Sequence, residues 1–197
     1  MLRDEKEKKL KIIAERISIC KDCNLFLERK KTVPGEGNPD ASIVFFGEGP
    51  GFNEDEEGRP FVGAAGSLLE EKIKFLGLKR SDVFITNVIK CRPPGNRNPE
   101  PEEINSCKKF FLAQISIIKP KIVVTLGKFS TEVMIGQEFG KISQIHGQIF
   151  YQEKCNLIVF PTFHPAAALR NGDFRDLFDR DFEKLKIFIE KEGFLKS

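Results

Sequence analysis

The chain has 197 residues, of which 40% are hydrophobic and 31% are charged, and its net charge is +3. This composition supplies a hydrophobic core and excludes a disordered chain, while the net charge is too small to indicate a nucleic-acid-binding protein by itself. No segment reaches the roughly 18 apolar residues of a membrane span, and the charged N-terminus lacks the apolar core of a secretory signal. We therefore expect one cytoplasmic domain over residues 1–197, monomeric and without a membrane partner.

The predicted secondary structure alternates between helices and buried strands. An amphipathic helix comes first, where Leu10, Ile13 and Ile17 recur at helical spacing just before Cys20. Four apolar, β-branched-rich runs predict strands at 42–46, 82–86, 121–127 and 156–165, and helical spacing lies between them at 67–76 and 101–118. A last helix carries one apolar stripe, formed by Phe174, Leu177, Phe178, Phe182, Leu185 and Ile189.

This order of elements predicts the fold class α/β. Strands that are apolar on both faces are typical of parallel sheets covered on two sides, so we expect a three-layer α/β/α sandwich with a central four-stranded, mostly parallel sheet. Ligands bind such sheets at the carboxyl ends of the strands. An unusual motif follows each predicted strand at that end: GEGPG (47–51), TNVIKCRPPGNRNP (86–99), GKFS (127–130) and HPAAALRN (164–171).

The first motif, GEGPG, does not have the chemistry of a phosphate-binding loop. It lacks the Lys-Ser/Thr ending of a P-loop and the spacing of a dinucleotide-binding turn, and the carboxylate of Glu48 would repel phosphate. Its glycines instead expose backbone N–H groups beside a carboxylate. An ordinary strand-to-helix turn with an exposed Glu is the alternative. Of the acidic cluster that follows, Glu54–Glu57, we expect a solvated turn in which Glu54 alone reaches the site.

Three further side chains are candidates for the same crevice. Phe61 either fills the core or stacks on a planar ligand. Asn87 either caps a turn or offers its amide donor and acceptor to the edge of a base. His164 stands before Pro165, which favours an extended backbone at the strand end. The other histidine, His146, precedes an expected hairpin strand, and we expect it to be structural.

Four of the five cysteines fall into a pattern typical of a metal site. Cys20 and Cys23 form a C-x-x-C pair, and Cys91 and Cys107 follow without a neighbouring His. In a reducing cytoplasm these thiols indicate a metal site rather than disulfides. Zinc and a [4Fe–4S] cluster both accept four cysteines, so the spacing leaves that choice open. Cys155 is expected to be a small buried hydrophobe.

Together these motifs resemble the family 4 uracil-DNA glycosylases, the iron–sulfur branch of the uracil-DNA glycosylase superfamily. GEGPG, GRPFVGAAG, TNVIKCRPP and HPAAALR occur in the order of that family, and the likeness covers about three quarters of the chain, from Cys20 to Arg170. Two positions depart from the family pattern. Phe52 stands where a more polar residue is expected, and Ala64 stands where Lys or Arg is commoner.

The resemblance implies a DNA-repair enzyme that flips deoxyuridine out of DNA and hydrolyses its N-glycosidic bond, which releases uracil and leaves an abasic site. It implies catalytic roles for Glu48, which positions or deprotonates the attacking water, and for His164, which donates to uracil O2. The other expected uracil contacts are Gly49, Pro50, Gly51, Phe61 and Asn87. Phe61 would stack on the base, and Asn87 would read its edge.

The resemblance also implies a structural [4Fe–4S] cluster on Cys20, Cys23, Cys91 and Cys107, with zinc as the alternative. The cluster would place Lys90, Arg92 and Arg97 against uracil-containing DNA. A DNA wedge is expected in the last motif, at Ala167, Ala168, Leu169 and Arg170. Two other classes stay open: a non-catalytic four-cysteine nucleic-acid-binding module, and an electron-transfer protein. The sequence gives no sign of a sliding-clamp contact.

Overall fold

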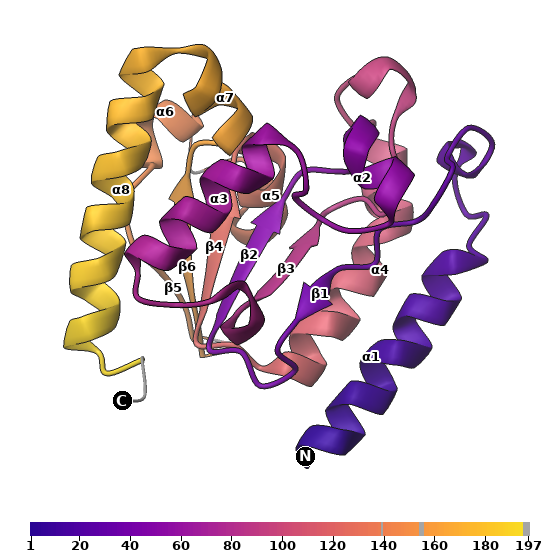
Figure 1. The fold of residues 1–197 in the computed structure, drawn as a ribbon, viewed down its shortest axis with the longest axis horizontal. Helices are drawn as coiled ribbons and strands as arrows, with labels where there is room; N and C mark the ends of the chain where they lie inside the picture. The colour runs from indigo at the N-terminus through magenta and orange to yellow at the C-terminus, as the bar shows by residue number, and fades with distance from the viewer. Residues whose placement is uncertain (139, 154–155, 195–197) are drawn as a thin grey trace.

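The computed structural model describes residues 1–138, 140–153 and 156–194, so the prediction for Cys155 lies outside the described residues. Its centre is one sheet in the order β1-β3-β2-β4-β6-β5. The strands are β1 (Glu36–Gly37), β2 (Ile43–Gly47), β3 (Phe84–Asn87), β4 (Ile122–Leu126), β5 (Phe150–Gln152) and β6 (Leu157–Thr162). Figure 1 shows the sheet with helices on both faces, which confirms the predicted α/β/α arrangement.

The sheet has six strands, so the prediction of four was wrong. The four strands expected from apolar runs are β2, β3, β4 and β6, and they pair in parallel. The additional strands, β1 and β5, pair antiparallel at the two edges. They have two and three residues, too few to show an apolar pattern, and neither is fully buried. The β5 strand is the hairpin strand expected after His146.

Alternate side chains of the central strands face two separate cores. On β2, Ile43 and Phe45 point toward α3 (Ala64–Phe75) and α8 (Gly172–Lys191). Val44 and Phe46 point the other way, toward α4 (Pro101–Ile118) and α1 (Arg3–Ser18). Because successive side chains of a strand point to opposite faces, one apolar run supplies both cores.

The final helix, α8, packs on the sheet as its apolar stripe predicts. Phe178, Phe182, Leu185 and Ile189 are buried, and Phe45 of β2 stacks on Phe182 with ring centroids 6.3 Å apart. Each such side chain contributes about 1.5–3 kcal/mol when it is fully buried. The first residue of the stripe, Phe174, is partly exposed. Phe178 and Phe182 therefore belong to the core, together with Leu185 and Ile189.

The remaining helices are short and connect the sheet to its ligand edge. They are α2 (Phe52–Glu57), α5 (Lys128–Ile135), α6 (Ile142–Ile145) and α7 (Pro165–Arg170), with 3-10 turns at Asn24–Phe26, Arg80–Asp82 and Pro94–Asn96. Two of them, α2 and α7, begin close after the carboxyl ends of β2 and β6. The polypeptide therefore turns sharply at that edge and places loop residues around it.

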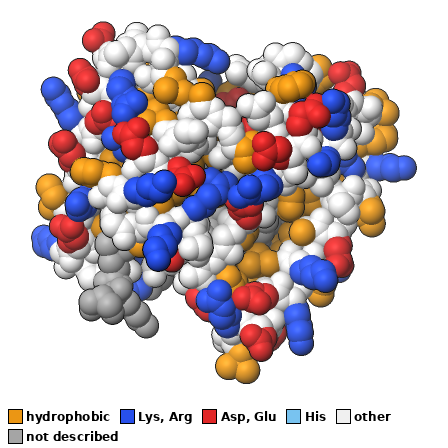
Figure 2. Space-filling view, viewed as in Figure 1, with side chains coloured by type: hydrophobic (Ala, Val, Ile, Leu, Met, Phe, Trp, Pro, Cys, Tyr) orange, Lys and Arg blue, Asp and Glu red, His pale blue; other side chains and the backbone are white. Residues whose placement is uncertain are grey.

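The surface in Figure 2 mixes Lys and Arg with Asp and Glu, and hydrophobic side chains appear in the hollow beside α1. That hollow lies between α1 and the β1 edge and is lined by apolar residues that include Leu10, Ala14 and Phe84. None of the helices among the described residues combines the length and apolarity that a membrane crossing requires.

Candidate active site

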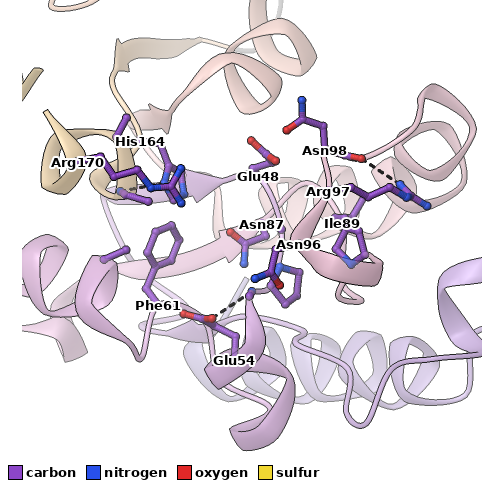
Figure 3. Close-up of a pocket in the computed structure, with 17 residues that line it drawn as sticks. Glu48, Glu54, Phe61, Asn87, Ile89, Asn96, Arg97, Asn98, His164 and Arg170 are labelled. Atoms are coloured by element: carbon purple, nitrogen blue, oxygen red, sulfur yellow. Dashed lines mark hydrogen bonds between the residues drawn. The ribbon is translucent and has the colours of Figure 1, made fainter.

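A crevice of about 360 Å³ opens at the carboxyl ends of β2, β3 and β6 (Figure 3). Its volume falls within the range typical of small-molecule sites, about 300–1,000 Å³. All seven residues expected to contact uracil line it: Glu48, Gly49, Pro50, Gly51, Phe61, Asn87 and His164. Figure 3 shows His164 and Arg170 on one side of Glu48, with Arg97 and Asn98 on the other.

Glu48 is the carboxylate at the centre of this crevice. It directly follows β2, and no partner within the described residues pairs with its carboxylate. Burial raises the pKa of Glu48 above its ordinary value of 4.5, because the charged form loses water contacts. An unpaired, partly desolvated carboxylate at a strand end is typical of a catalytic base.

His164 supplies an uncharged imidazole to the same space. It caps the N-terminus of α7, where the backbone N–H of Ala166 donates to its Nδ1 at 3.2 Å. Because Nδ1 accepts this bond, we assign the ring proton to Nε2. Burial, with a smaller effect of the positive charge of Arg170, lowers the pKa of His164 to about 4. The side chain is therefore a neutral donor through Nε2 at physiological pH.

Phe61 is held in a conformation that few aromatic residues adopt. Its φ is +50°, its side chain is 6% exposed, and its ring centroid lies 5.7 Å from that of His164. The Arg80 guanidinium donates to the carbonyls of Pro60 and Phe61. A non-glycine residue with positive φ stores strain that the surrounding contacts must hold, and such strain is concentrated at functional sites.

Asn87 forms the floor of the crevice at the end of β3. Its side chain is 2% exposed, and its Oδ1 is buried without a hydrogen-bond partner in the described structure. Buried amide oxygens are normally paired, so an unpaired one that lines a crevice indicates a missing ligand donor. The backbone carbonyl of Asn87 accepts a hydrogen bond from Lys90 Nζ at 2.8 Å.

Gly47 allows these groups to converge. A Cβ atom at Gly47 would lie 2.3 Å from Asn87 Oδ1 and 2.5 Å from Phe61 Cζ. In the Gly47→Ala variant we expect uracil release, the reaction implied by the resemblance, to fall about 10²-fold, since misplacement by about 1 Å costs that much. Single-turnover kinetics measure the effect. The matched control is Gly172→Ala, where a Cβ meets nothing within 4 Å; an equal loss in both variants would contradict the prediction.

Glu54 joins two loops of the crevice, a role that the sequence indicated only in part. Its Oε2 accepts from the backbone N–H of Gly51 and its Oε1 from that of Val62, both at 3.1 Å. Asp55 is buried and accepts hydrogen bonds from the backbone N–H groups of Lys30 and Lys31. The prediction of a solvated acidic turn was therefore wrong for Asp55, which anchors the preceding loop.

The expected DNA-contact residues of the last motif occupy different environments. Ala167 and Arg170 line the crevice, and Leu169 is exposed beside it. Ala168 is buried in the core that α8 covers, so its side chain is not available to DNA. The prediction for Ala168 was wrong because α7 packs against α3 and α8 and turns one side toward the core that they share.

The basic residues after β3 are similarly divided. Arg97 lines the crevice but forms a bidentate pair with Glu103, at 2.6 and 2.9 Å. The Arg92 guanidinium lies 5.1 Å from the ring centroid of Phe52, which is 53% exposed next to the crevice. Lys90 is buried, so the prediction that it faces DNA was wrong.

The four cysteines of the predicted metal site line one small cavity together with Arg29 and Lys90. Burial raises the pKa of the Cys107 thiol to about 12 and that of Cys91 and Cys23 above 9.0. Arg29 Nη1 donates to Cys91 Sγ at 3.1 Å. Among the described residues, no three His, Cys, Asp or Glu side chains lie close enough to hold a metal ion as they stand. The donor set of four thiols that share this cavity suits zinc or a cluster.

Comparison with known proteins identifies the family. A family model described as the uracil DNA glycosylase superfamily matches residues 34–186. The chain belongs to the uracil DNA glycosylase superfamily. Among curated members, it is 52% identical to the Type-4 uracil-DNA glycosylase of Sulfurisphaera tokodaii, over 90% of this chain and 83% of that protein. It is 45% identical to the Type-4 uracil-DNA glycosylase of Thermotoga maritima, over 95% of this chain and 98% of that protein.

The match to the uracil DNA glycosylase superfamily includes the whole crevice but begins after Cys20 and Cys23. These two cysteines belong to the longer stretch, from Cys20 to Arg170, over which the sequence resembles the family 4 enzymes. Sequence reasoning missed other residues of the crevice wall, namely Ala65, Ile89, Pro93, Asn96, Asn98 and Ala166. All six lie inside the motifs GRPFVGAAG, TNVIKCRPPGNRNP and HPAAALRN, and membership of a motif was the signal that could have indicated them.

Proposed function

We propose that this chain, a uracil-DNA glycosylase of DNA repair, binds a flipped deoxyuridine in the crevice and hydrolyses its N-glycosidic bond with Glu48 and His164. The observation that carries the proposal is the buried Oδ1 of Asn87 on the crevice floor, which has no hydrogen-bond partner among the described residues. Uracil offers an N3–H donor beside its O4 acceptor. The Asn87 amide accepts the first and donates to the second.

This pairing distinguishes uracil from cytosine. Cytosine has an acceptor at N3 and a donor at its exocyclic amine, so both contacts with Asn87 would oppose like groups. A site whose buried polar groups are left unpaired by the wrong base rejects that base strongly. The aromatic face of Phe61 supplies stacking, which every base shares and which therefore adds affinity rather than selectivity.

The target atom lies inside the duplex, so the nucleotide must leave the stack first. Unstacking and unpairing cost a few kcal/mol, and the cost is lowest at a mismatch or in a single strand. Arg170 lines the crevice and Leu169, the residue before it on α7, is exposed; in this proposal Arg170 contacts the DNA backbone and Leu169 fills the space in the stack.

His164 stabilises the departing base. Negative charge develops on uracil as the glycosidic bond breaks, and a donor at O2 lowers the energy of that state. The Nε2–H of neutral His164 is the donor, and the backbone N–H of Gly49 adds to it, since that of Gly51 already donates to Glu54. A neutral imidazole suits this task because its proton is shared with the anion without prior ionisation.

Glu48 acts on the sugar side of the bond. The sugar becomes cationic as uracil leaves, and a carboxylate beside it both offsets that charge and orients a water molecule for attack. Desolvation makes the carboxylate more basic, as its raised pKa shows. Glu48, which would repel a phosphate, thus stabilises a cationic transition state.

The four cysteines hold a [4Fe–4S] cluster in this proposal, with zinc as the alternative. The cluster supplies no electron to a hydrolysis and has a structural role, because its ligands join the segment after α1 to the loop after β3 and the start of α4. Iron analysis and visible absorbance of protein purified without oxygen test it, and a colourless zinc protein would exclude the cluster. The whole chain acts as one monomeric domain.

The activity itself is tested with a uracil-containing oligonucleotide. We expect alkali-labile abasic sites to form at the uracil position, and none in a matched oligonucleotide with cytosine at that position. A non-catalytic module would bind the oligonucleotide without producing such sites, and an electron-transfer protein would not produce them either. Intact uracil oligonucleotide after prolonged incubation with cluster-loaded protein would contradict the proposed function.

The role of Asn87 can be measured separately. In the Asn87→Ala variant we expect kcat/KM for uracil release to fall about 5–150-fold, because two base-edge contacts, worth roughly 1–3 kcal/mol as a bidentate pair, are lost. The matched control is Asn105→Ala, an exposed residue of α4. Wild-type kinetics in Asn87→Ala would remove its proposed reading role.

A further inference from the structure

Lys90 is a fully buried lysine between the cysteines and the crevice. It is 1% exposed and follows β3 by three residues. Its Nζ lies 2.5 Å from Thr86 Oγ1, 2.8 Å from the carbonyl oxygen of Asn87 and 3.0 Å from Gln114 Oε1. It also lines the small cavity that the four cysteines share.

The hydrogen bonds around Lys90 suit an ammonium group. Gln114 donates its Nε2 to the carbonyl of Pro34 at 2.6 Å, so its Oε1 faces Lys90. The Thr86 hydroxyl hydrogen has its own acceptors in Pro34 O and Gln114 Oε1, so its oxygen accepts from Lys90. The third partner is a carbonyl, which only accepts. Three acceptors use three hydrogens, the number that a protonated lysine carries.

This buried cation has no carboxylate partner among the described ion pairs. The three oxygens that it contacts are neutral, and the ionisable groups that act on it are Cys91 and Cys107. An unpaired buried charge is strongly unfavourable, so a nearby anion is expected. Protonated thiols do not supply one. Four metal-bound thiolates do, and a [4Fe–4S] core in its common 2+ state would leave about two negative charges on the centre.

We propose that Lys90 is the counter-cation of the cysteine-bound cluster and, at the same time, the positioning residue that fixes Asn87 for uracil. One ammonium group compensates the charge of the metal centre on one side and holds the backbone of the base-reading residue on the other. The inference rests on the proposed function of the crevice and on the proposed cluster. It explains why a charged side chain occupies the core between two polar sites.

Two substitutions separate the two roles. Lys90→Met keeps the length of the side chain and removes both the charge and the donors, whereas Lys90→Gln keeps a donor without the charge. Lys72→Met is the matched control, because Lys72 is also buried but pairs with Asp179 on the far side of the sheet. All are compared as cluster-reconstituted full-length protein.

The charge role is read from the metal centre. We expect the reduction potential of the cluster to move to more negative values in both Lys90 variants and to stay unchanged in Lys72→Met, because net charge sets such potentials. Iron retention in the presence of a chelator should fall in the same two variants. An unchanged potential and unchanged iron retention in the Lys90 variants would overturn the counter-cation role, as would a wild-type protein that binds zinc alone.

The positioning role is read from kinetics. We expect single-turnover uracil release to fall about 10²-fold in Lys90→Met, with partial recovery in Lys90→Gln and no change in binding of uracil-free DNA. If Lys90→Met does not fold, Lys90→Gln still decides both roles through its potential and its rate. A wild-type rate in Lys90→Gln would overturn the positioning role. Absence of activity in the wild-type protein would instead count against the proposed function.

Discussion

In the Glu48→Gln variant, single-turnover uracil release is expected to fall about 10²–10⁴-fold, the usual contribution of a general base. Gln keeps the shape of the side chain but neither carries negative charge toward the cationic sugar nor accepts a proton from water. Binding of uracil-containing DNA should change little, because Glu48 contacts no phosphate in the proposed mechanism. Rapid-quench kinetics with enzyme in excess measure the chemical step alone.

The pH dependence identifies the same group. Glu48 acts as a carboxylate, so the rate should decline as the pH falls through its pKa, which burial raises above 4.5. The acid limb of the profile should therefore lie above pH 4.5 in the wild type and be absent from the residual activity of Glu48→Gln. An identical acid limb in both proteins would assign that limb to another group.

Stability provides an internal control for Glu48→Gln. The folded-state pKa of Glu48 is raised, so ionisation opposes folding, and stability is lost as the pH rises from 4.5 through the folded-state pKa. At pH 7 the variant should have a higher Tm than the wild type, and the difference should disappear near pH 4. A loss of activity with a higher Tm excludes unfolding as its cause.

In the His164→Ala variant, single-turnover uracil release is expected to fall about 10²–10³-fold, which is typical for the loss of one preorganised donor to a developing anion. The pKa of His164, near 4, keeps the imidazole neutral across pH 5–8. The rate in wild type should therefore show no titration of His164 in that range. KM should change less than kcat, since the donor acts mainly in the transition state.

The other histidine of the chain offers a control. His146 Nδ1 bonds both oxygens of buried Asp181, at 3.0 and 2.9 Å, away from the residues that line the crevice. His146→Gln retains a donor for Asp181, and we expect it to alter thermal stability but not the chemical step. A rate loss in His146→Gln as large as that in His164→Ala would contradict the specific role of His164.

Much of the fold follows from local patterns in the sequence. The runs that form β2, β3, β4 and β6 are apolar on both faces. Because both faces must be buried, the stable arrangement is a parallel sheet with helices on each side. The edge strands were not predictable in the same way. Two residues of β1 pair with β3 through backbone hydrogen bonds, which any side chains permit.

The sequence was least informative where an effect depends on neighbours from distant segments. Lys90 resembles a surface lysine in sequence, and only its contacts with Thr86 and Gln114 make it a buried cation. Asp55 similarly looks like part of an acidic turn, yet the backbone of the Lys30 loop buries it. In both cases a polar side chain is buried because partners from elsewhere in the chain satisfy it.

The amino-acid sequence by itself determined the α/β architecture, the position of the site at the strand ends, and the chemical groups Glu48, Phe61, Asn87 and His164 that meet there. It could do so because apolar periodicity and motif order are local properties. The tertiary structure alone decided which groups have partners. It left Asn87 Oδ1 without a partner among the described residues, made the imidazole of His164 neutral with its proton on Nε2, and turned Ala168 and Lys90 inward. The protonation of a side chain, the strain of its backbone and the pairing of its hydrogen-bonding groups depend on distances between residues far apart in the chain. Folding sets those distances.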